Sequence, residues 1–252
     1  AGRGSLHPWC LPVDPRRFVR LGPGNVRVER TLEFGPNEAV SIAPGTTVEL
    51  APGASLIFLG PLFALGTAET PIRLVAQRER WGGLALLGPG TAGSRLVHLE
   101  LRGATSPRLP LTELPAAVNI HDTAGVTLAH CRITGGKGRA GALHAAYVQG
   151  LLLGDLEIRR TPDDAVDFEF VTGVIQGLTV IGAGQEALDL MGGAVVLSDS
   201  RLLDCGGNGI SVGSGARFAA ARVLVAGSRV GLLVKSGSQV WLDEVLFQDD
   251  GT

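Results

Sequence analysis

Four five-residue segments recur at a spacing of 22 residues in the C-terminal half of the chain: DAVDF at 164–168, EALDL at 186–190, NGISV at 208–212 and VGLLV at 230–234. In the first three segments, polar residues alternate with the apolar residues Val166, Leu188 and Ile210. An alternation of period two is typical of a β-strand with one buried face. Upstream, Leu143 and Val118 continue the series at spacings of 23 and 25 residues. A strand unit that recurs at such an interval predicts a solenoid.

A second column of apolar residues runs in step with the first. It consists of Ile133, Ile158, Val180, Leu202, Val223 and Phe247, and two residues before each of these lies Cys131, Leu156, Leu178, Ser200, Ala221 or Val245. Corners such as Gly182-Ala183-Gly184 separate the columns, because glycine supplies the positive φ of tight turns. Ser200 is a polar exception in its column, so we expect it to bond a backbone group. Two strand columns per repeat predict an all-β right-handed parallel β-helix with about 22 residues per coil.

The composition fits many short strands joined by tight corners. Gly accounts for 37 of 252 residues, charged residues for 18% and aromatic residues for 5%. The formal net charge is −2 and the arginines are scattered among acids, which argues against a nucleic-acid-binding surface. There is no run of about 18 apolar residues that would predict a transmembrane helix. Cys10, Cys131 and Cys205 lie too far apart for a disulfide framework or a CxxC metal site, and we expect small buried or corner residues.

The chain divides into a lead-in and a solenoid. Residues 1–30 contain four prolines and predict an irregular N-terminal lead-in or cap. Residues 31–252 are assigned to the β-helix, with a loop insertion near 104–116 of the kind that often carries binding. The last expected strand has no amphipathic helix after it to cover its edge, so we expect either a longer natural chain or a partner subunit there. Trp241 and Phe247 on this strand are the candidate interface residues.

Several segments resemble a known family. They are Pro44-Gly45-Thr46-Thr47-Val48-Glu49-Leu50, Gly53-Ala54-Ser55-Leu56, Trp81-Gly82-Gly83-Leu84 and the four recurring segments above. Over about residues 25–247 the chain is similar to bacterial right-handed β-helix proteins of the parallel β-helix repeat type, within the pectate-lyase-like superfold. Such modules often accompany spore-coat-H-like kinase domains at the cell surface, and no kinase-like domain is present in this sequence. The resemblance implies the fold and export to the periplasm, the cell surface or the medium, but no single activity.

A polar ladder follows from the strand alternation. If Val166, Leu188 and Ile210 point into the core, the residues that follow them point outward, with rungs about 4.8 Å apart. The ladder consists of Asn119, His144, Asp167, Asp189 and Ser211. We expect all five side chains to share one outer face.

The two aspartates are the chemical centre of this ladder. Asp167 and Asp189 would lie close enough for one to have a raised pKa, or for both to bind a hard cation such as Ca²⁺ with Asp163 or Asp164 nearby. Glu169 is expected to point outward beside Asp167. The candidate catalytic residues are Asp167 and Asp189, which are paired carboxylates of the kind used on glycosides, and His144 as a general base.

Two interpretations of the ladder remain open: a strip that binds sugar or a cation, and a solvated surface whose Asp and Asn side chains hold the corners. Among the motifs of β-helix enzymes, only Asp163-Asp164 matches the polygalacturonase-like pattern, and no Gly-His-Gly is present. Arg159-Arg160-Thr161-Pro162 resembles the pectate-lyase-like pattern in composition alone. The rings that could stack on a sugar are Trp81, Tyr147, Phe168, Phe170 and Trp241.

The sequence therefore leads to two functional hypotheses. The first is a non-enzymatic, exported structural or interaction solenoid that acts within a larger protein assembly or at the cell surface. It would contact a protein partner, or a second copy, through its open C-terminal coil. The alternative is a carbohydrate-active enzyme (a polysaccharide lyase, hydrolase or epimerase) or a polysaccharide-binding module, with Ca²⁺ as the only cofactor that the residues suggest.

Overall fold

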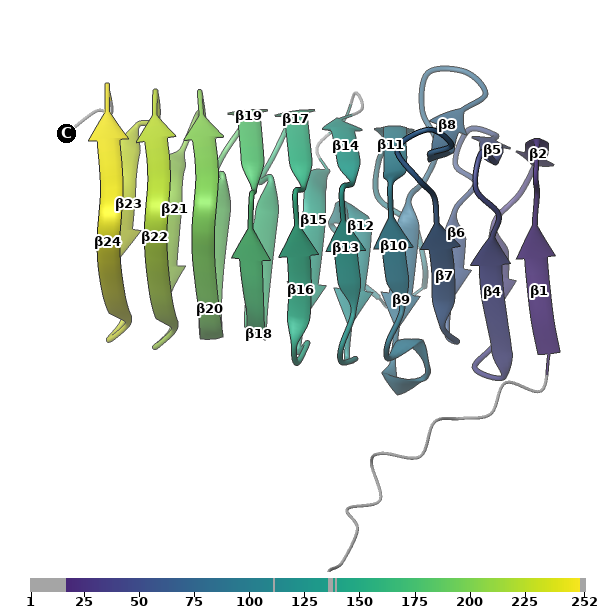
Figure 1. Ribbon diagram of the computed structural model, residues 1–252, viewed down its shortest axis with the longest axis horizontal. Coiled ribbons are helices and arrows are strands. Elements are labelled where there is room, and N and C mark those ends of the chain that lie inside the picture. Colours follow the sequence, from purple (N-terminus) through teal and green to yellow (C-terminus); the bar gives the residue numbers. More distant parts are fainter. Residues whose placement is uncertain (1–16, 111, 136–137, 139, 250–252) are drawn as a thin grey trace, which may run out of the picture.

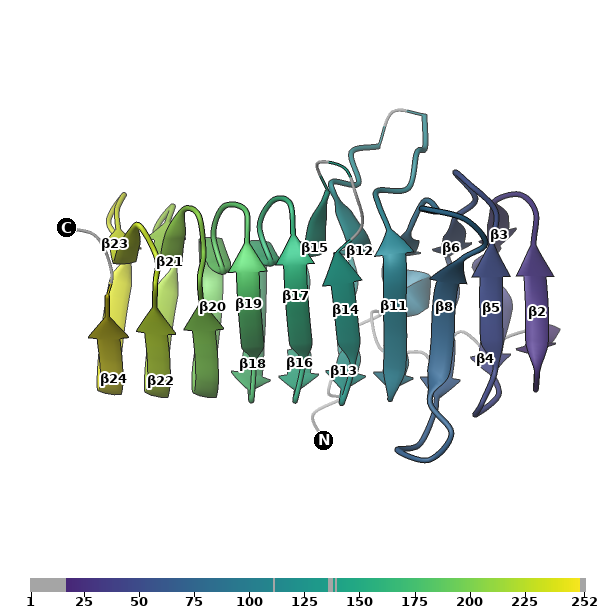
Figure 2. The same cartoon turned by 90° about the horizontal axis from the view of Figure 1, so that it is seen from above.

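The computed structural model describes residues 17–110, 112–135, 138 and 140–249. It is a right-handed parallel β-helix of about ten turns, as the sequence predicted (Figures 1 and 2). Successive turns contribute strands to three parallel sheets, which we call sheets A, B and C, and the chain visits them in that order. Among the described residues the one helical element is the 3-10 turn at Pro89–Thr91, and none is a helix long and apolar enough to cross a membrane.

The sheets are built from short strands and, toward the C-terminus, from long strands that bend from one sheet into the next. Sheet A contains β1 (Arg17–Leu21), β4 (Glu38–Ile42), β7 (Leu62–Leu65), β10 (Arg95–Val97), β13 (Thr127–Ala129) and β16 (Leu151–Gly154). Sheet B contains β2 (Asn25–Val28), β5 (Thr47–Leu50), β8 (Ile72–Ala76), β11 (Leu99–Ala104), β14 (Arg132–Gly135), β17 (Glu157–Thr161) and β19 (Thr179–Ala183). Sheet C contains β3 (Leu32–Phe34), β6 (Leu56–Phe58), β9 (Leu84–Leu87), β12 (Ala116–His121), β15 (Gly141–Ala146), β21 (Asn208–Gly213) and β23 (Val230–Val234). The bent strands are β18 (Val166–Gln176), β20 (Leu188–Leu203), β22 (Arg217–Ala226) and β24 (Gln239–Gln248).

The first predicted column is sheet C. Leu143, Val166, Leu188 and Ile210 pair with one another in register on successive turns, and Val166, Leu188 and Ile210 are fully buried. The prediction that these residues point inward is confirmed. Because the strands stack in register, residues that are one repeat apart in the sequence are neighbours in space.

The second predicted column is sheet B, and the sequence misplaced part of its last turns. Leu202 pairs with Val225 rather than with Val223, and Ser200 pairs with Val223 rather than with Ala221. The reason is one additional residue in the turn after Gly213, which lengthens that repeat from 22 to 23 residues. The prediction for Ser200 is confirmed, because its hydroxyl accepts a hydrogen bond from the Leu178 amide at 3.0 Å and donates one to the Ser198 carbonyl at 2.6 Å.

Sheet A is a third column, where the sequence predicted two per coil. It includes residues 171–176 of β18 and 193–198 of β20, which bend out of sheet C at Phe170 and near Gly192, while the last residues of β20 pair with β19 in sheet B. Phe170 has a φ of 53°, in the left-handed region where non-glycine residues are uncommon. In β18 the chain turns this corner at Phe170 without a glycine, whereas Gly192 and Gly193, both with positive φ, form the corresponding corner in β20.

The solenoid begins earlier than the expected boundary near residue 30. Strand β1 pairs with β4, and β2 pairs with β5, so residues from Arg17 onward already belong to the first turn. Cys10 and the rest of residues 1–16 lie outside the described residues. The expected insertion lies between the end of β11 and the start of β12, and its Leu109 and Leu114 pack on Ile57 and Ala85, on the outer face of sheet C.

The interior is an aliphatic column that runs the length of the solenoid. Trp81 and Phe168 belong to it, with 0% and 1% of their surface exposed. Their candidacy as sugar-stacking rings was therefore wrong: Phe168 has the inward parity of Val166, and Trp81 donates its indole N–H to the Arg102 carbonyl at 3.0 Å. Cys131 and Cys205 are buried free thiols, as expected.

Candidate functional site

The outer face of sheet C places the five ladder residues in consecutive rungs. Asn119 pairs with His144, His144 with Asp167, Asp167 with Asp189, and Asp189 with Ser211. Strands β12, β15, β18, β20 and β21 each supply one rung. The rung order follows from the sequence repeat, since each residue directly follows an inward-pointing member of the core column.

The ladder is much less exposed than an outward-facing strip was expected to be. Asn119, His144 and Ser211 are 0%, 6% and 2% exposed. The Asn119 amide is used within its own strand: its Oδ1 accepts from the Ala116 N–H at 3.2 Å, and its Nδ2 donates to the Ala116 carbonyl at 2.6 Å. Asn119 therefore has a structural contact, and the half-buried centre of the ladder is the part that can meet a ligand.

Asp167 and Asp189 form that centre. Burial, together with the nearby charges of Asp189 and Glu169, raises the pKa of Asp167 to about 7. Asp189 Oδ1 is buried and has no hydrogen-bond partner among the described residues. Two adjacent carboxyl groups, one of which has a raised pKa, can take part together in general acid–base chemistry.

His144 joins this centre from the preceding turn. Its Nε2 lies 3.7 Å from Asp167 Oδ2 and 3.8 Å from Glu169 Oε1. Its Nδ1 lies 2.8 Å from Nε2 of His121, and the two rings meet edge to face. Burial lowers the pKa of His144, which Glu169 partly opposes, and burial with the nearby His144 lowers the pKa of His121 to about 4. Both rings are therefore neutral at neutral pH.

Sequence reasoning missed His121. It lies two residues after Asn119 and so shares its outward parity, one turn before His144. This alternation is the feature of the sequence from which His121 could have been identified. Glu169 does lie beside Asp167, and the potential ligand atoms of His144, Asp167 and Glu169 all lie within 4.8 Å of one another.

Asp163 and Asp164 occupy the corner that leads from sheet B into sheet C. Asp164 Oδ1 accepts a hydrogen bond from the Glu186 N–H at 2.8 Å. Burial raises the pKa of Asp164 to about 8, with contributions from Glu186 and Asp163. Glu186 Oε1 in turn accepts from Asn208 Nδ2 at 2.7 Å. Asp164 therefore helps to form the corner and lies beside the ladder rather than on it.

Two exposed aromatic rings border the ladder where sheet C bends into sheet A. Tyr147 and Phe170 are 58% and 49% exposed, and their rings stack with centroids 5.3 Å apart and planes 10° from parallel. Each ring lies at the corner after its sheet C segment, on the same turns as His144 and Asp167. The solenoid thus presents an aromatic surface beside a half-buried acidic centre.

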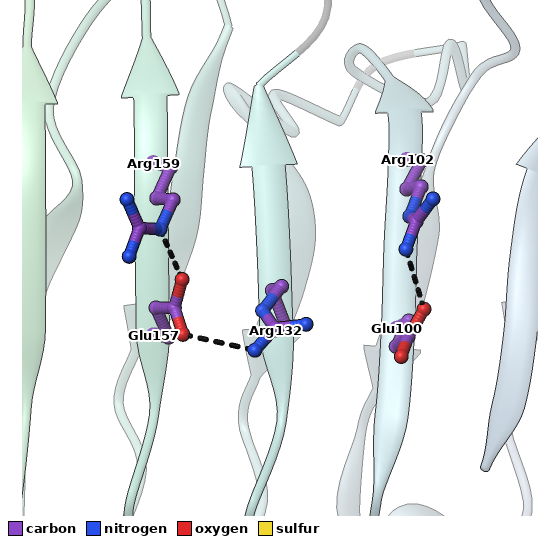
Figure 3. Close-up of polar contacts among 5 residues, drawn as sticks. All are labelled: Glu100, Arg102, Arg132, Glu157 and Arg159. Carbon is purple, nitrogen blue, oxygen red and sulfur yellow. Dashed lines mark hydrogen bonds and ion pairs between the residues drawn. The ribbon is translucent and has the colours of Figure 1, made fainter.

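The outer face of sheet B is different, because its charges pair with one another. Glu100 contacts Arg102 at 2.9 Å, and Glu157 contacts Arg132 at 3.1 Å as well as Arg159 (Figure 3). Burial alone would raise the pKa of Glu157, but hydrogen bonds from the two arginines outweigh it and hold that pKa below its usual value. Exposed ion pairs of this kind contribute little and leave no group unsatisfied, so this face is a weaker candidate site.

The two interface candidates lie on β24 in the last described turn. Trp241 pairs with Ala219 and is 57% exposed, on the outer side of sheet A. Phe247 pairs with buried Val225, so it continues the core column, yet it is 38% exposed. Trp241 is therefore a surface residue, while Phe247 is a core position at an uncovered edge.

Comparisons with known proteins show the fold. No family model and no curated protein matches the chain, so the association with spore-coat-H-like kinase domains has no support. The catalytic domain of a GH87 α-1,3-glucanase in complex with nigerose matches with a TM-score of 0.57, at 12% identity over 98% of this chain. A variant of that domain, also with nigerose, gives a TM-score of 0.59 at 12% identity and the same coverage.

This chain covers 47% of the length of those glucanase domains. The periplasmic alginate epimerase AlgG matches with a TM-score of 0.41, at 9% identity over 88% of this chain and 74% of AlgG. The glucanase domains establish the shared β-helix architecture.

Proposed function

We propose that this chain is an exported polysaccharide-binding module, and that it binds its glycan along the outer face of sheet C. The observation that supports the proposal best is the exposed stack of Tyr147 and Phe170 beside the acidic centre. Aromatic faces combine a large apolar surface with an affinity for C–H groups, and exposing two of them together is unfavourable unless a ligand covers them.

The chemistry of the face indicates the class of glycan. Asp167, Asp189 and Glu169 make it acidic, so an anionic polymer would be repelled and a neutral polysaccharide fits better. Strands of successive turns lie about 4.8 Å apart, which is close to the length of a sugar unit, so a linear glycan can contact several turns at once. The glucanase domains with the same architecture hold nigerose, a neutral saccharide, which is compatible with this choice.

Affinity electrophoresis in gels that contain a neutral glucan, and in parallel gels that contain alginate, tests the proposal. We expect retardation by the neutral polymer and at least a tenfold loss of affinity, about 1.4 kcal/mol, in the double variant Tyr147→Ala, Phe170→Ala. Phe18→Ala is the matched control, since it removes an exposed aromatic ring from sheet A, far from β24. Equal losses in the control and the double variant would refute the assignment to sheet C.

A second candidate function is cleavage of the bound glycan. The adjacent rungs Asp167 and Asp189 favour it, because two carboxylates on one face of a saccharide site can act as acid and base or nucleophile. Release of new reducing ends or unsaturated ends from the bound polymer, abolished in Asp167→Asn, Asp189→Asn, would establish the enzyme. Binding without any release by the unaltered chain would leave the module non-enzymatic.

A protein contact through β24 is part of the same proposal. Trp241 and Leu246 are 57% and 58% exposed on its outer side, and Leu242 is 44% exposed at a core position. A strand from a second copy or from another protein would pair with the free edge of β24 and cover these apolar side chains. Light scattering on the 252-residue chain should show association that Trp241→Ala, Leu242→Glu abolishes, whereas a concentration-independent monomer would remove this contact.

A further inference from the structure

We propose that His144, Asp167 and Glu169 form a binding site for a divalent transition-metal ion. The site lies on the outer face of sheet C but does not depend on the saccharide proposal, since its residues are distinct from the stacked rings. It comprises one imidazole nitrogen and two carboxylate oxygens from two adjacent strands, β15 and β18.

The distances fit ligands that share an ion better than they fit groups that bond one another. His144 Nε2 lies 3.7 Å from Asp167 Oδ2 and 3.8 Å from Glu169 Oε1, beyond hydrogen-bond range. Atoms that each lie about 2.1 Å from a tetrahedral ion are separated by about 3.4 Å. The two distances from His144 are a few tenths of an ångström longer than that separation, and the partly exposed Glu169 carboxylate can move toward a shared ion.

The imidazole is already oriented for this role. The 2.8 Å contact with His121 occupies Nδ1 of His144 and leaves Nε2 directed toward the carboxylates. The side chain is 7% exposed, so the surrounding packing fixes the ring. Metal-bound histidines commonly donate their second N–H to a neighbouring acceptor, and His121 Nε2, 2.8 Å from Nδ1 of His144, can serve as that acceptor.

A cation would also give Asp189, on the neighbouring rung, a favourable interaction. Asp189 Oδ1 is buried without a hydrogen-bond partner among the described residues, one turn beyond Asp167. A buried carboxylate oxygen without a partner is costly, and Asp189 is thus placed to act as a further ligand or as a partner of metal-bound water. The imidazole favours Zn²⁺ or Mn²⁺ over Ca²⁺, which prefers ligand sets made entirely of oxygen. The present site therefore differs from the calcium pair of Asp167 and Asp189 suggested by the sequence.

Calorimetric titration of the chelator-treated 252-residue chain with Zn²⁺, Mn²⁺ and Ca²⁺ tests the site. We expect one Zn²⁺ or Mn²⁺ per chain, with at least tenfold weaker affinity in Glu169→Gln and in Asp167→Asn. The matched control is His130→Gln, which alters another His–Asp contact, 3.1 Å from Asp155, on an exposed corner. Co²⁺ should give a visible absorption band that both carboxylate variants change and the control does not.

Several outcomes would overturn the site: no binding of Zn²⁺ or Mn²⁺, binding of Ca²⁺ alone, or binding that both carboxylate variants leave intact. If Asp167→Asn fails to fold, Glu169→Gln decides the matter, because Glu169 is the most exposed of the three. The Tyr147→Ala, Phe170→Ala variant should bind the ion as the unaltered chain does. Failure of the saccharide proposal can therefore be told apart from failure of the metal site.

Discussion

Replacing Asp164 by asparagine should stabilise the chain, and more so as the pH rises. Asp164 accepts a hydrogen bond from the Glu186 N–H at 2.8 Å, and its protonated form also bonds the Glu186 side chain. Asparagine keeps the acceptor oxygen and supplies an N–H in place of the carboxyl O–H. The variant Asp164→Asn thus reproduces the neutral form at every pH without altering the geometry of the corner.

The sign follows from the direction of the pKa shift. Burial and Glu186 raise the pKa of Asp164 from 3.8 to about 8, so the folded chain holds a proton that the unfolded chain releases. The wild type therefore loses stability, relative to the variant, as the pH rises between about 4 and 8. If the whole pKa shift acted on stability, the difference in the free energy of unfolding between the variant and the wild type would grow by about 4 kcal/mol from about pH 5 to pH 8. Screening of this partly exposed side chain reduces our expectation to about 1–2 kcal/mol.

Thermal unfolding followed by circular dichroism measures this effect. For a chain of this size about 1–2 kcal/mol corresponds to about 2–8 °C in melting temperature. We expect the advantage of Asp164→Asn over the wild type to grow by that amount between about pH 5 and pH 8. Glu186→Gln should give a similar advantage, and the double variant should gain less than the sum, because both changes relieve one repulsion. A variant advantage that stays constant with pH, or a less stable variant at the higher pH, would refute the reasoning.

Three further predictions concern single residues. Gly193→Ala should lower the melting temperature by the equivalent of about 2 kcal/mol or more, because Gly193 has a φ of 79° and a Cβ would overlap the Val171 carbonyl oxygen. Cys131 should resist alkylation in the folded chain at about pH 8 and react on unfolding, since burial raises its pKa to about 11; mass spectrometry of the labelled peptide would show this. Asp199→Asn should lower the melting temperature at neutral pH but not near pH 2, because hydrogen bonds from Arg222 at 2.6 and 2.9 Å hold the pKa of Asp199 below its usual value.

The repeat in the sequence was sufficient to predict sheet C because a parallel solenoid stacks its strands in register. Once Val166, Leu188 and Ile210 are recognised as equivalent, the neighbours of Asp167 and Asp189 follow without any knowledge of the turns. Sheet B could be predicted only until the turn after Gly213, because one added residue there changes the repeat length without changing the alternation. Sheet A was not recognised as a separate column because β18 and β20 run from sheet C into sheet A without ending, although Gly192 and Gly193 mark one of these corners.

The sequence did not predict how deeply the side chains on the outer face of sheet C are buried. Alternation tells which side of a strand a residue occupies, but not what covers that side. Asn119 and His144 occupy the predicted face and are nevertheless buried, the first through its bonds to Ala116 and the second beside His121. Such burial requires contacts between rows of adjacent turns, which depend on side-chain conformation rather than on register. The same contacts give Asp167 its raised pKa and direct Nε2 of His144 toward two carboxylates, so the part of the face that the sequence could not predict is also the part that carries its chemistry.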